Sequence, residues 1–160
     1  MKIDGACHCG YIRVEGDADP EKTTVCHCTD CQVSTGSAFR VNVPVPGATF
    51  RITGQPATYL KTTAESGNPR LQAFCPRCGS PIYSTTPGEG PQPSYTVRVG
   101  ILRQRKEFVP KRQNWLKSPG PAPDFFQPGL ARLAEEVRPA PGAKQQPLLP
   151  AAANAPAWIE

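Results

Sequence analysis

The seven cysteines of this chain fall into three short clusters, and no cysteine lies outside them. The first cluster is Cys7 and Cys9, the middle cluster is Cys26, Cys28 and Cys31, and the last cluster is Cys75 and Cys78. An odd number of cysteines cannot form a complete set of disulfides within one chain. Seven thiolates do divide naturally into a closed tetrahedral zinc site of four and an open site of three.

The spacing within each cluster indicates which cysteines share an ion. Cys75 and Cys78 enclose a proline and precede Gly79, which suits a tight turn around a metal. The first cluster also precedes a glycine, but its two thiols cannot close a site alone. The middle cluster has three thiols within six residues and can form a three-coordinate site unaided. We therefore expect two zinc ions, with the first ion bound by Cys7, Cys9, Cys75 and Cys78 and the second by Cys26, Cys28 and Cys31.

Other interpretations of the cysteines are weaker. Cys75 and Cys78 could be a redox dithiol, but no βαβ pattern surrounds them. Disulfides of a secreted domain are not favoured, because the chain begins without a basic and then apolar signal segment, so we expect a cytoplasmic protein. His8 and His27 stand between cysteines, where a side chain tends to point away from the ion. We expect both to lie near the metal sites rather than to bind metal.

Composition predicts a single domain with one modest core, since 38% of the 160 residues are hydrophobic. No apolar run approaches the roughly 20 residues that cross a bilayer, so no membrane contact is expected. The net charge is +5, and seven thiolates with two zinc ions would lower it by three to +2, which does not favour nucleic acid. Basic residues concentrate between residues 98 and 117, which carry a net +6. This basic stretch is either a solvated face or a docking surface for a small dianionic ligand, with Arg103 among its contacts.

Short segments of alternating hydrophobicity predict a mainly β, antiparallel fold. The expected strands are residues 11–15, 39–43, 49–53, 57–61 and 95–99, and proline and glycine separate them. Phe39, Val41 and Val43 should share one face. A short C-terminal helix is expected over residues 128–137. The domain should span residues 1–138, and the tail of residues 139–160, rich in proline and alanine, should be disordered.

Four segments resemble the glutathione-dependent formaldehyde-activating family, also called the GFA or CENP-V domain family. They are Gly5–Gly10, Cys26–Phe39, Phe74–Pro81 and Val97–Gly100, and the resemblance covers roughly residues 3–135. It implies an Mss4-like β-tent with a structural zinc on the first and last clusters and a catalytic zinc on the middle cluster. It also implies a carbon–sulfur lyase that adds glutathione reversibly to formaldehyde and forms S-hydroxymethylglutathione.

This chemistry suits an open three-thiolate site. Zinc with three protein thiolates keeps a fourth position for a substrate thiol and holds it as thiolate. A small aldehyde then needs positioning and stabilisation of the developing alkoxide. Residues 34–37, which follow the third ligand, are expected to form a hydroxyl-rich loop whose backbone and side chains, Ser34 and Ser37 among them, supply these donors. Asp30 is either a proton acceptor or a carboxylate that caps the loop.

The chain departs from the family after its last strand, where Gln113 stands at the position of a family histidine. Trp115 is retained, and we expect it to help shape the pocket. The substrates could therefore be another thiol or another small aldehyde. Two rival functions remain: a zinc-binding interaction module that contacts protein or nucleic acid through the basic stretch, and a structural zinc protein whose middle cluster is a redox or metal-buffer site.

Overall fold

The computed structural model describes residues 1–62 and 67–114. The helix predicted over residues 128–137, the tail of residues 139–160 and Trp115 lie outside the described residues. Within the described ranges, strands dominate and the sheets are almost entirely antiparallel, so the predicted mainly β architecture is confirmed. Within the same ranges, no helix has the length and apolar character needed to span a membrane.

A small sheet begins the chain. It consists of β1 (Lys2–Ala6), β2 (Arg13–Asp17) and β5 (Arg51–Thr53), all antiparallel, in the order β1-β2-β5. The turn between β1 and β2 holds the first cysteine cluster. This sheet therefore carries two metal-ligand candidates on its hairpin turn.

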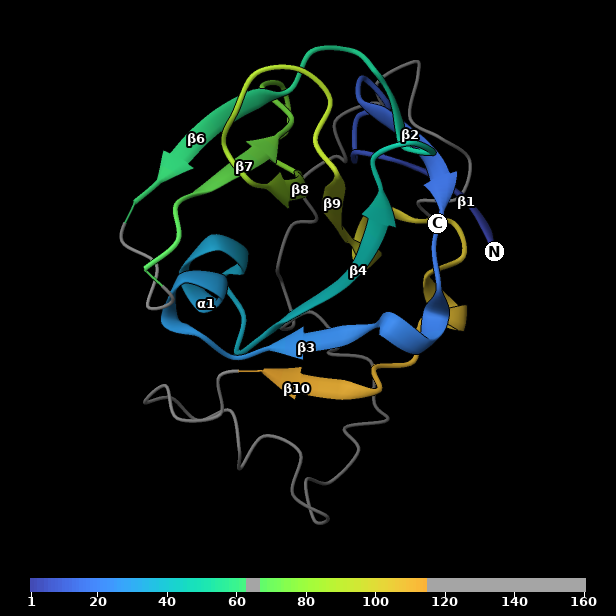
Figure 1. Ribbon diagram of the computed structural model, residues 1–160, viewed down its shortest axis with the longest axis vertical. Coiled ribbons are helices and arrows are strands. Elements are labelled where there is room, and N and C mark those ends of the chain that lie inside the picture. The colour runs from blue at the N-terminus through green and yellow to red at the C-terminus, as the bar shows by residue number, and fades with distance from the viewer. Residues whose placement is uncertain (63–66, 115–160) are drawn as a thin grey trace, which may run out of the picture.

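A large sheet of seven strands makes up most of the rest, in the order β10-β3-β4-β9-β8-β7-β6. Its strands are β3 (Thr24–Cys26), β4 (Arg40–Pro46), β6 (Ala57–Lys61), β7 (Arg70–Phe74), β8 (Pro81–Thr85), β9 (Ser94–Arg98) and β10 (Arg112–Asn114). All neighbours pair antiparallel except β10, which runs parallel to β3 (Figure 1). The sheet curves, and the short helix α1 (Thr29–Thr35) lies between its β3 end and its β6 end (Figure 1).

The hydrophobic core is built by one face of the large sheet together with the small sheet. Its largest fully buried apolar side chains are Ile12, Val14, Val43, Val45, Ile82, Val97 and Leu102. Phe50 stacks on Tyr95 with ring centroids 4.3 Å apart. Cys7 and Cys75 belong to this core with no exposed surface, so the predicted metal ligands are part of the packing that holds the domain together.

The expected strands are found with small boundary differences. Strand β6 begins and ends where it was predicted, and the other four expected strands are shifted or resized by one to three residues at their ends. The sequence pattern missed β1, β3, β7, β8 and β10. These strands are short or carry polar residues that interrupt the alternation, and they form because neighbouring strands pair with them. Val41 and Val43 lie on the same face of β4 as predicted, since residues two apart share a face, whereas Phe39 precedes the strand.

Helix α1 corrects the prediction that residues 34–37 form a loop. Its seven residues have little intrinsic helix propensity, and a helix this short is marginal in isolation. It is held by its ends: the Sγ of Cys28 accepts a hydrogen bond from the N–H of Cys31, and Gly36 ends the helix with a left-handed φ of 64°. The cysteine spacing therefore specifies a helical turn as well as a ligand set.

A close approach between the small sheet and the segment after β9 generates a stability prediction. Gly5 pairs with Leu102, and a methyl group added at Gly5 would lie 2.2 Å from the carbonyl oxygen of Ile101. We expect Gly5→Ala to lower the free energy of unfolding by about 1–3 kcal/mol or more, because backbone must shift to make room. Chemical denaturation measures it. Gly100→Ala is the matched control, since no atom lies within 4 Å of its added methyl group. Equal stability of the two variants would contradict this packing.

Candidate metal sites and the adjoining cavity

The first and last clusters converge on one point. The Sγ atoms of Cys7, Cys9, Cys75 and Cys78 all lie within 4.8 Å of one another. The separation is 3.6 Å between Cys7 and Cys9 and 3.7 Å between Cys9 and Cys75. Four sulfurs placed tetrahedrally at about 2.3 Å from an ion would be roughly 3.8 Å apart. The four thiols therefore fit a closed thiolate site, as the cysteine count predicted.

Two similar turns bring these thiols together. The N–H of Gly10 donates to the carbonyl of Cys7, and the N–H of Gly79 donates to the carbonyl of Cys75, each at 2.9 Å. Both glycines have a positive φ, of 75° and 72°, which an L side chain rarely adopts. The turn glycines thus have the role that the sequence predicted.

Hydrogen bonds join the two turns across more than seventy residues of chain. The N–H of His8 donates to the Oγ of Ser80 at 3.1 Å, and the same oxygen lies 3.2 Å from the Sγ of Cys78. The N–H of Ile12 donates to the Sγ of Cys7 at 3.2 Å. Such N–H and O–H contacts stabilise thiolate sulfur, and they hold the ligands in place around the ion.

The thiols of this closed cluster differ in acidity. Burial is the main effect on the Cys7 thiol and raises its pKa. Burial also opposes ionisation of Cys78, but hydrogen bonds from the side chain and backbone of Ser80, with smaller contributions from Cys9 and Cys75, lower its pKa to about 6. A metal ion needs all four as thiolates, so its binding must expel protons from the more buried members.

The middle cluster forms a second, separate group. The Sγ atoms of Cys26, Cys28 and Cys31 lie within 4.8 Å of one another, with 3.5 Å between Cys26 and Cys28. Cys26 ends β3 and Cys31 lies in the first turn of α1. A hydrogen bond from Cys31 lowers the pKa of Cys26, and the same bond, with burial, raises the pKa of Cys31. Cys26 is thus the thiol of this group that ionises most readily.

The donor sets of both clusters fit a metal ion that prefers thiolate ligands, as zinc does. Neither histidine joins them among the described residues, because the metal-compatible groups found there contain cysteines alone. His27 is buried, and its Nε2 forms a hydrogen bond with the Oε1 of Gln113 at 3.0 Å. Gln113 of β10 therefore contacts the residue that stands between Cys26 and Cys28.

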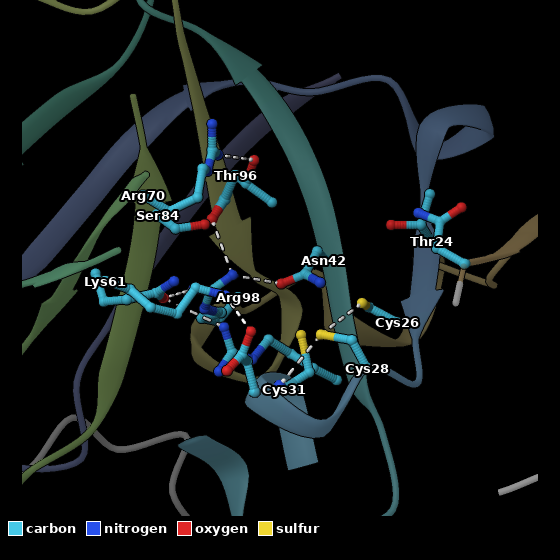
Figure 2. Close-up of a pocket in the computed structure, with 14 residues that line it drawn as sticks. Thr24, Cys26, Cys28, Cys31, Asn42, Lys61, Arg70, Ser84, Thr96 and Arg98 are labelled. Atoms are coloured by element: carbon cyan, nitrogen blue, oxygen red, sulfur yellow. Dashed lines mark hydrogen bonds and ion pairs between the residues drawn. The ribbon is translucent and has the colours of Figure 1, made fainter. Parts of the chain in front are cut away.

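A cavity of about 240 Å³ adjoins the middle cluster. Figure 2 shows Arg98 near its centre, with Cys26, Cys28 and Cys31 on one side and Arg70, Ser84 and Thr96 on the other. The strands bring these side chains together by register. Gln72, Ser84 and Thr96 are paired across β7, β8 and β9, and Asn42 is paired with Arg98 across β4 and β9. The face of the large sheet opposite the core is therefore polar and lines this cavity.

The cavity is basic. Its lining includes the cations Arg40, Lys61, Arg70 and Arg98 and the single carboxylate Asp30, within the described part of the chain. The Nζ of Lys61 lies 2.5 Å from a carboxylate oxygen of Asp30, so this ion pair joins β6 to α1 at the cavity. Asp30, predicted as a proton acceptor or a capping carboxylate, thus lies beside the middle cluster with a cationic partner.

Other predicted residues do not line the cavity. The hydroxyl of Ser34 donates to the backbone carbonyl of Asp30 at 2.6 Å, and that of Ser37 donates to the carbonyl of Phe39 at 2.5 Å. Both serines are exposed: Ser34 lies in α1 and bonds back to the carbonyl four residues earlier, and Ser37 lies just beyond the end of the helix. Arg103 is exposed and pairs with Asp4 at 3.1 Å. The binding roles predicted for these three side chains remain predictions.

The basic stretch of residues 98–117 does not form one continuous surface within its described part. Arg98 is buried in the cavity, Arg103 pairs with Asp4, and Lys111 pairs with Glu21. Three of the described cations of this stretch are thus divided between the interior and separate surface ion pairs.

The sequence contained a signal for the cavity that the strand predictions did not use. Polar residues recur two apart in three strands: Arg40 with Asn42, Arg70 with Gln72, and Thr96 with Arg98. Apolar residues fill the alternate positions, and Val43, Ala73 and Val97 among them lie in the core. A strand with both faces buried and one of them polar indicates a polar interior site.

Fold and sites together define a class: a two-sheet β protein with a closed four-cysteine cluster and an open three-cysteine cluster beside a basic cavity. The model of one protein family, described as glutathione-dependent formaldehyde-activating enzyme, matches residues 2–118. The chain belongs to this family, and the resemblance stated from its motifs is confirmed.

One curated relative is similar in sequence, and one solved structure is similar in fold. A Halomonas elongata protein named "Putative glutathione-dependent formaldehyde-activating enzyme" is 26% identical over 91 residues, which is 54% of this chain and 58% of the relative. The chain therefore matches little more than half the length of that relative. A crystal structure of a Rhodobacter sphaeroides protein matches with a TM-score of 0.51 and 18% identity, over 69% of this chain and 99% of the other. That likeness concerns the fold alone.

Burial predicts different consequences for losing each cluster. We expect Cys75→Ser to lose one bound metal ion and to lower the free energy of unfolding by several kcal/mol, because Cys75 is fully enclosed in the core. Cys28→Ser should also lose one metal ion but keep the fold, since the middle cluster opens into a cavity. Metal content by mass spectrometry and thermal unfolding by circular dichroism measure both. Equal destabilisation by the two substitutions would contradict this distinction.

Proposed function

We propose that this protein is a carbon–sulfur lyase that adds a thiol reversibly to a small aldehyde, with glutathione and formaldehyde as the first pair to test. The product of that pair is S-hydroxymethylglutathione. The observation that carries the proposal is the three-cysteine cluster that opens directly into a cavity. Family membership supports the same chemistry.

We assign zinc to both clusters, with a structural role for Cys7, Cys9, Cys75 and Cys78 and a catalytic role for Cys26, Cys28 and Cys31. Bound by three thiolates, zinc supplies an open position that takes a substrate thiol and favours its thiolate form. The ligand count supports this division, because four thiolates complete a tetrahedron and three leave one vertex for a substrate.

Asp30 and Lys61, which form an ion pair, can accept the proton that is released and stabilise the negative charge that develops in the reaction. The Asp30 carboxylate accepts the proton of the incoming thiol, and the Lys61 ammonium stabilises negative charge that develops on the carbonyl oxygen. Both line the cavity, whereas the hydroxyls of Ser34 and Ser37 are engaged with backbone carbonyls. In the product, the sulfur–carbon bond has formed and the thiol proton has moved to the oxygen.

The test uses exchange spectroscopy on the full chain. Glutathione and formaldehyde form their adduct slowly and reversibly in solution, and magnetisation transfer between free and bound formaldehyde by NMR reports the exchange rate. We expect the zinc-loaded parent chain to accelerate exchange and Cys28→Ser to lose the acceleration while keeping one zinc ion and its fold. Two zinc ions without any acceleration would reject this pair of substrates.

Removal of the lysine charge gives a further prediction. Lys61→Met should lower the rate of adduct exchange by about 10²–10³-fold, as the loss of one donor to a developing oxyanion does elsewhere. Lys22→Met is the matched control, because Lys22 lies on the surface beside Asp19 and outside this cavity. Stopped-flow or NMR exchange rates compare them at equal zinc content. An unchanged rate in Lys61→Met would remove this residue from the mechanism.

A further inference from the structure

Three arginines in the cavity have only neutral partners. Arg98 donates to the Oδ1 of Asn42 at 2.6 Å and to the Oε1 of Gln72 at 2.7 Å. Arg40 donates to the same Gln72 oxygen at 3.3 Å, and Arg70 donates to the Oγ1 of Thr96 at 3.3 Å. Within the described residues none of the three guanidiniums pairs with a carboxylate.

Burial makes this arrangement costly. Arg40 and Arg98 are each only 5% exposed, and their Nε atoms have no hydrogen-bond partner among the described residues. Burial, and then the neighbouring charge of Arg40, lower the pKa of Arg98 to about 9, so this guanidinium is still charged at neutral pH. Like charges gathered in a buried site without a counter-ion are unfavourable, and a protein that keeps them gains when an anion binds between them.

The negative charge available in the cavity is smaller than the three positive charges of these guanidiniums. Asp30 is the cavity's one carboxylate among the described residues and is engaged by Lys61. A zinc ion with the three thiolates of the middle cluster carries a net charge of −1 and balances one guanidinium. A substrate thiolate would balance a second. One positive charge remains beside the place where the reacting carbon must lie.

We propose that Arg40, Arg70 and Arg98 form a binding subsite for a carboxylate group carried by a substrate. Guanidinium forks match the planar geometry of a carboxylate, and a single negative charge completes the balance. The cavity volume of about 240 Å³ is below the roughly 300–1,000 Å³ of drug-sized ligand sites, so the group recognised is small. The subsite rests on the proposed function and narrows its substrates.

The carboxylate can belong to either reactant. If the aldehyde carries the carboxylate, the substrate is a small aldehyde acid such as glyoxylate. If the thiol carries it, the substrate is a carboxylated thiol. The reaction balances in both cases: the thiol S–H adds across the C=O, the sulfur–carbon bond forms, the carbonyl π bond breaks, and the proton ends on oxygen. No oxidant or reductant is needed.

Two matched substrate pairs separate these sources. Glyoxylate and acetaldehyde differ by a carboxylate in place of a methyl group, and each is tested with 2-sulfanylethanol. Likewise 3-sulfanylpropanoate and 2-sulfanylethanol are each tested with formaldehyde. We expect the zinc-loaded full chain to favour the carboxylated member of one pair by at least about tenfold in kcat/KM, and that pair identifies the source. Turnover of both members of each pair without a preference in either pair would overturn the subsite.

Variants tie the preference to the arginines. Arg98→Met should abolish the preference, measured as the ratio of kcat/KM between the carboxylated and the uncharged member of the pair. Arg70→Met provides the same test at a less buried position, should Arg98→Met fail to fold by circular dichroism and zinc content. Arg13→Met, on the exposed side of β2, is the matched control and should retain the preference. A preference that survives in a folded Arg98→Met or Arg70→Met variant would overturn the subsite.

A binding measurement tests the subsite independently of the proposed lyase activity. Propanoate cannot react, so its titration into the zinc-loaded chain by calorimetry reports the carboxylate contact alone. Propanoate binding that is lost in Arg98→Met or Arg70→Met supports the subsite even if no pair of substrates is turned over. Adduct exchange with glutathione and formaldehyde in a chain that binds no propanoate overturns the subsite and leaves the proposed function standing.

Discussion

The convergence of four thiols from two distant turns is the constraint on which the rest of the structure depends. Cys7 and Cys9 lie on the turn of the small sheet, and Cys75 and Cys78 lie on the turn between β7 and β8 of the large sheet. The four-cysteine cluster thereby joins the small sheet to the large sheet, and the modest hydrophobic core packs around this cluster. Cys7 and Cys75 are as buried as the valines beside them.

The two faces of the large sheet differ in polarity and contact different parts of the protein. One face packs against the small sheet and is apolar, with Val43, Val45 and Val97 in its centre. The opposite face curves around the cavity beside α1 and is polar, with Asn42, Ser84 and Arg98 on neighbouring strands. Strand alternation alone produces both faces, because successive side chains point to opposite sides. A rigid sheet therefore presents the cavity residues to the middle cluster.

The electrostatics of the cavity follow from this arrangement. Thiolates and a metal ion would concentrate negative charge at the end of β3, and the strands opposite provide guanidiniums at short range. Asp30 and Lys61 link the helix that carries Cys31 to the far edge strand of the same sheet. The cavity therefore has negative ligands on one side and an excess of positive charge on the other. A small polar substrate with an anionic group is complementary to that distribution.

The sequence by itself determined the two cysteine groups, the turn glycines and the mainly β architecture, because these depend on short spacings and on alternation within single segments. Cysteine count and proximity were sufficient to divide seven thiols into four and three. Only the tertiary structure decided that Arg40, Arg70 and Arg98 meet in one cavity, because their approach depends on strand order and register across β4, β9, β8 and β7. It also decided that Ser34 and Ser37 lie outside the lining of that cavity, with their hydroxyls bonded to the backbone carbonyls of Asp30 and Phe39. The spacing of cysteines within short segments indicates the candidate metal ligands, whereas the residues that surround a site depend on contacts between segments far apart in the chain.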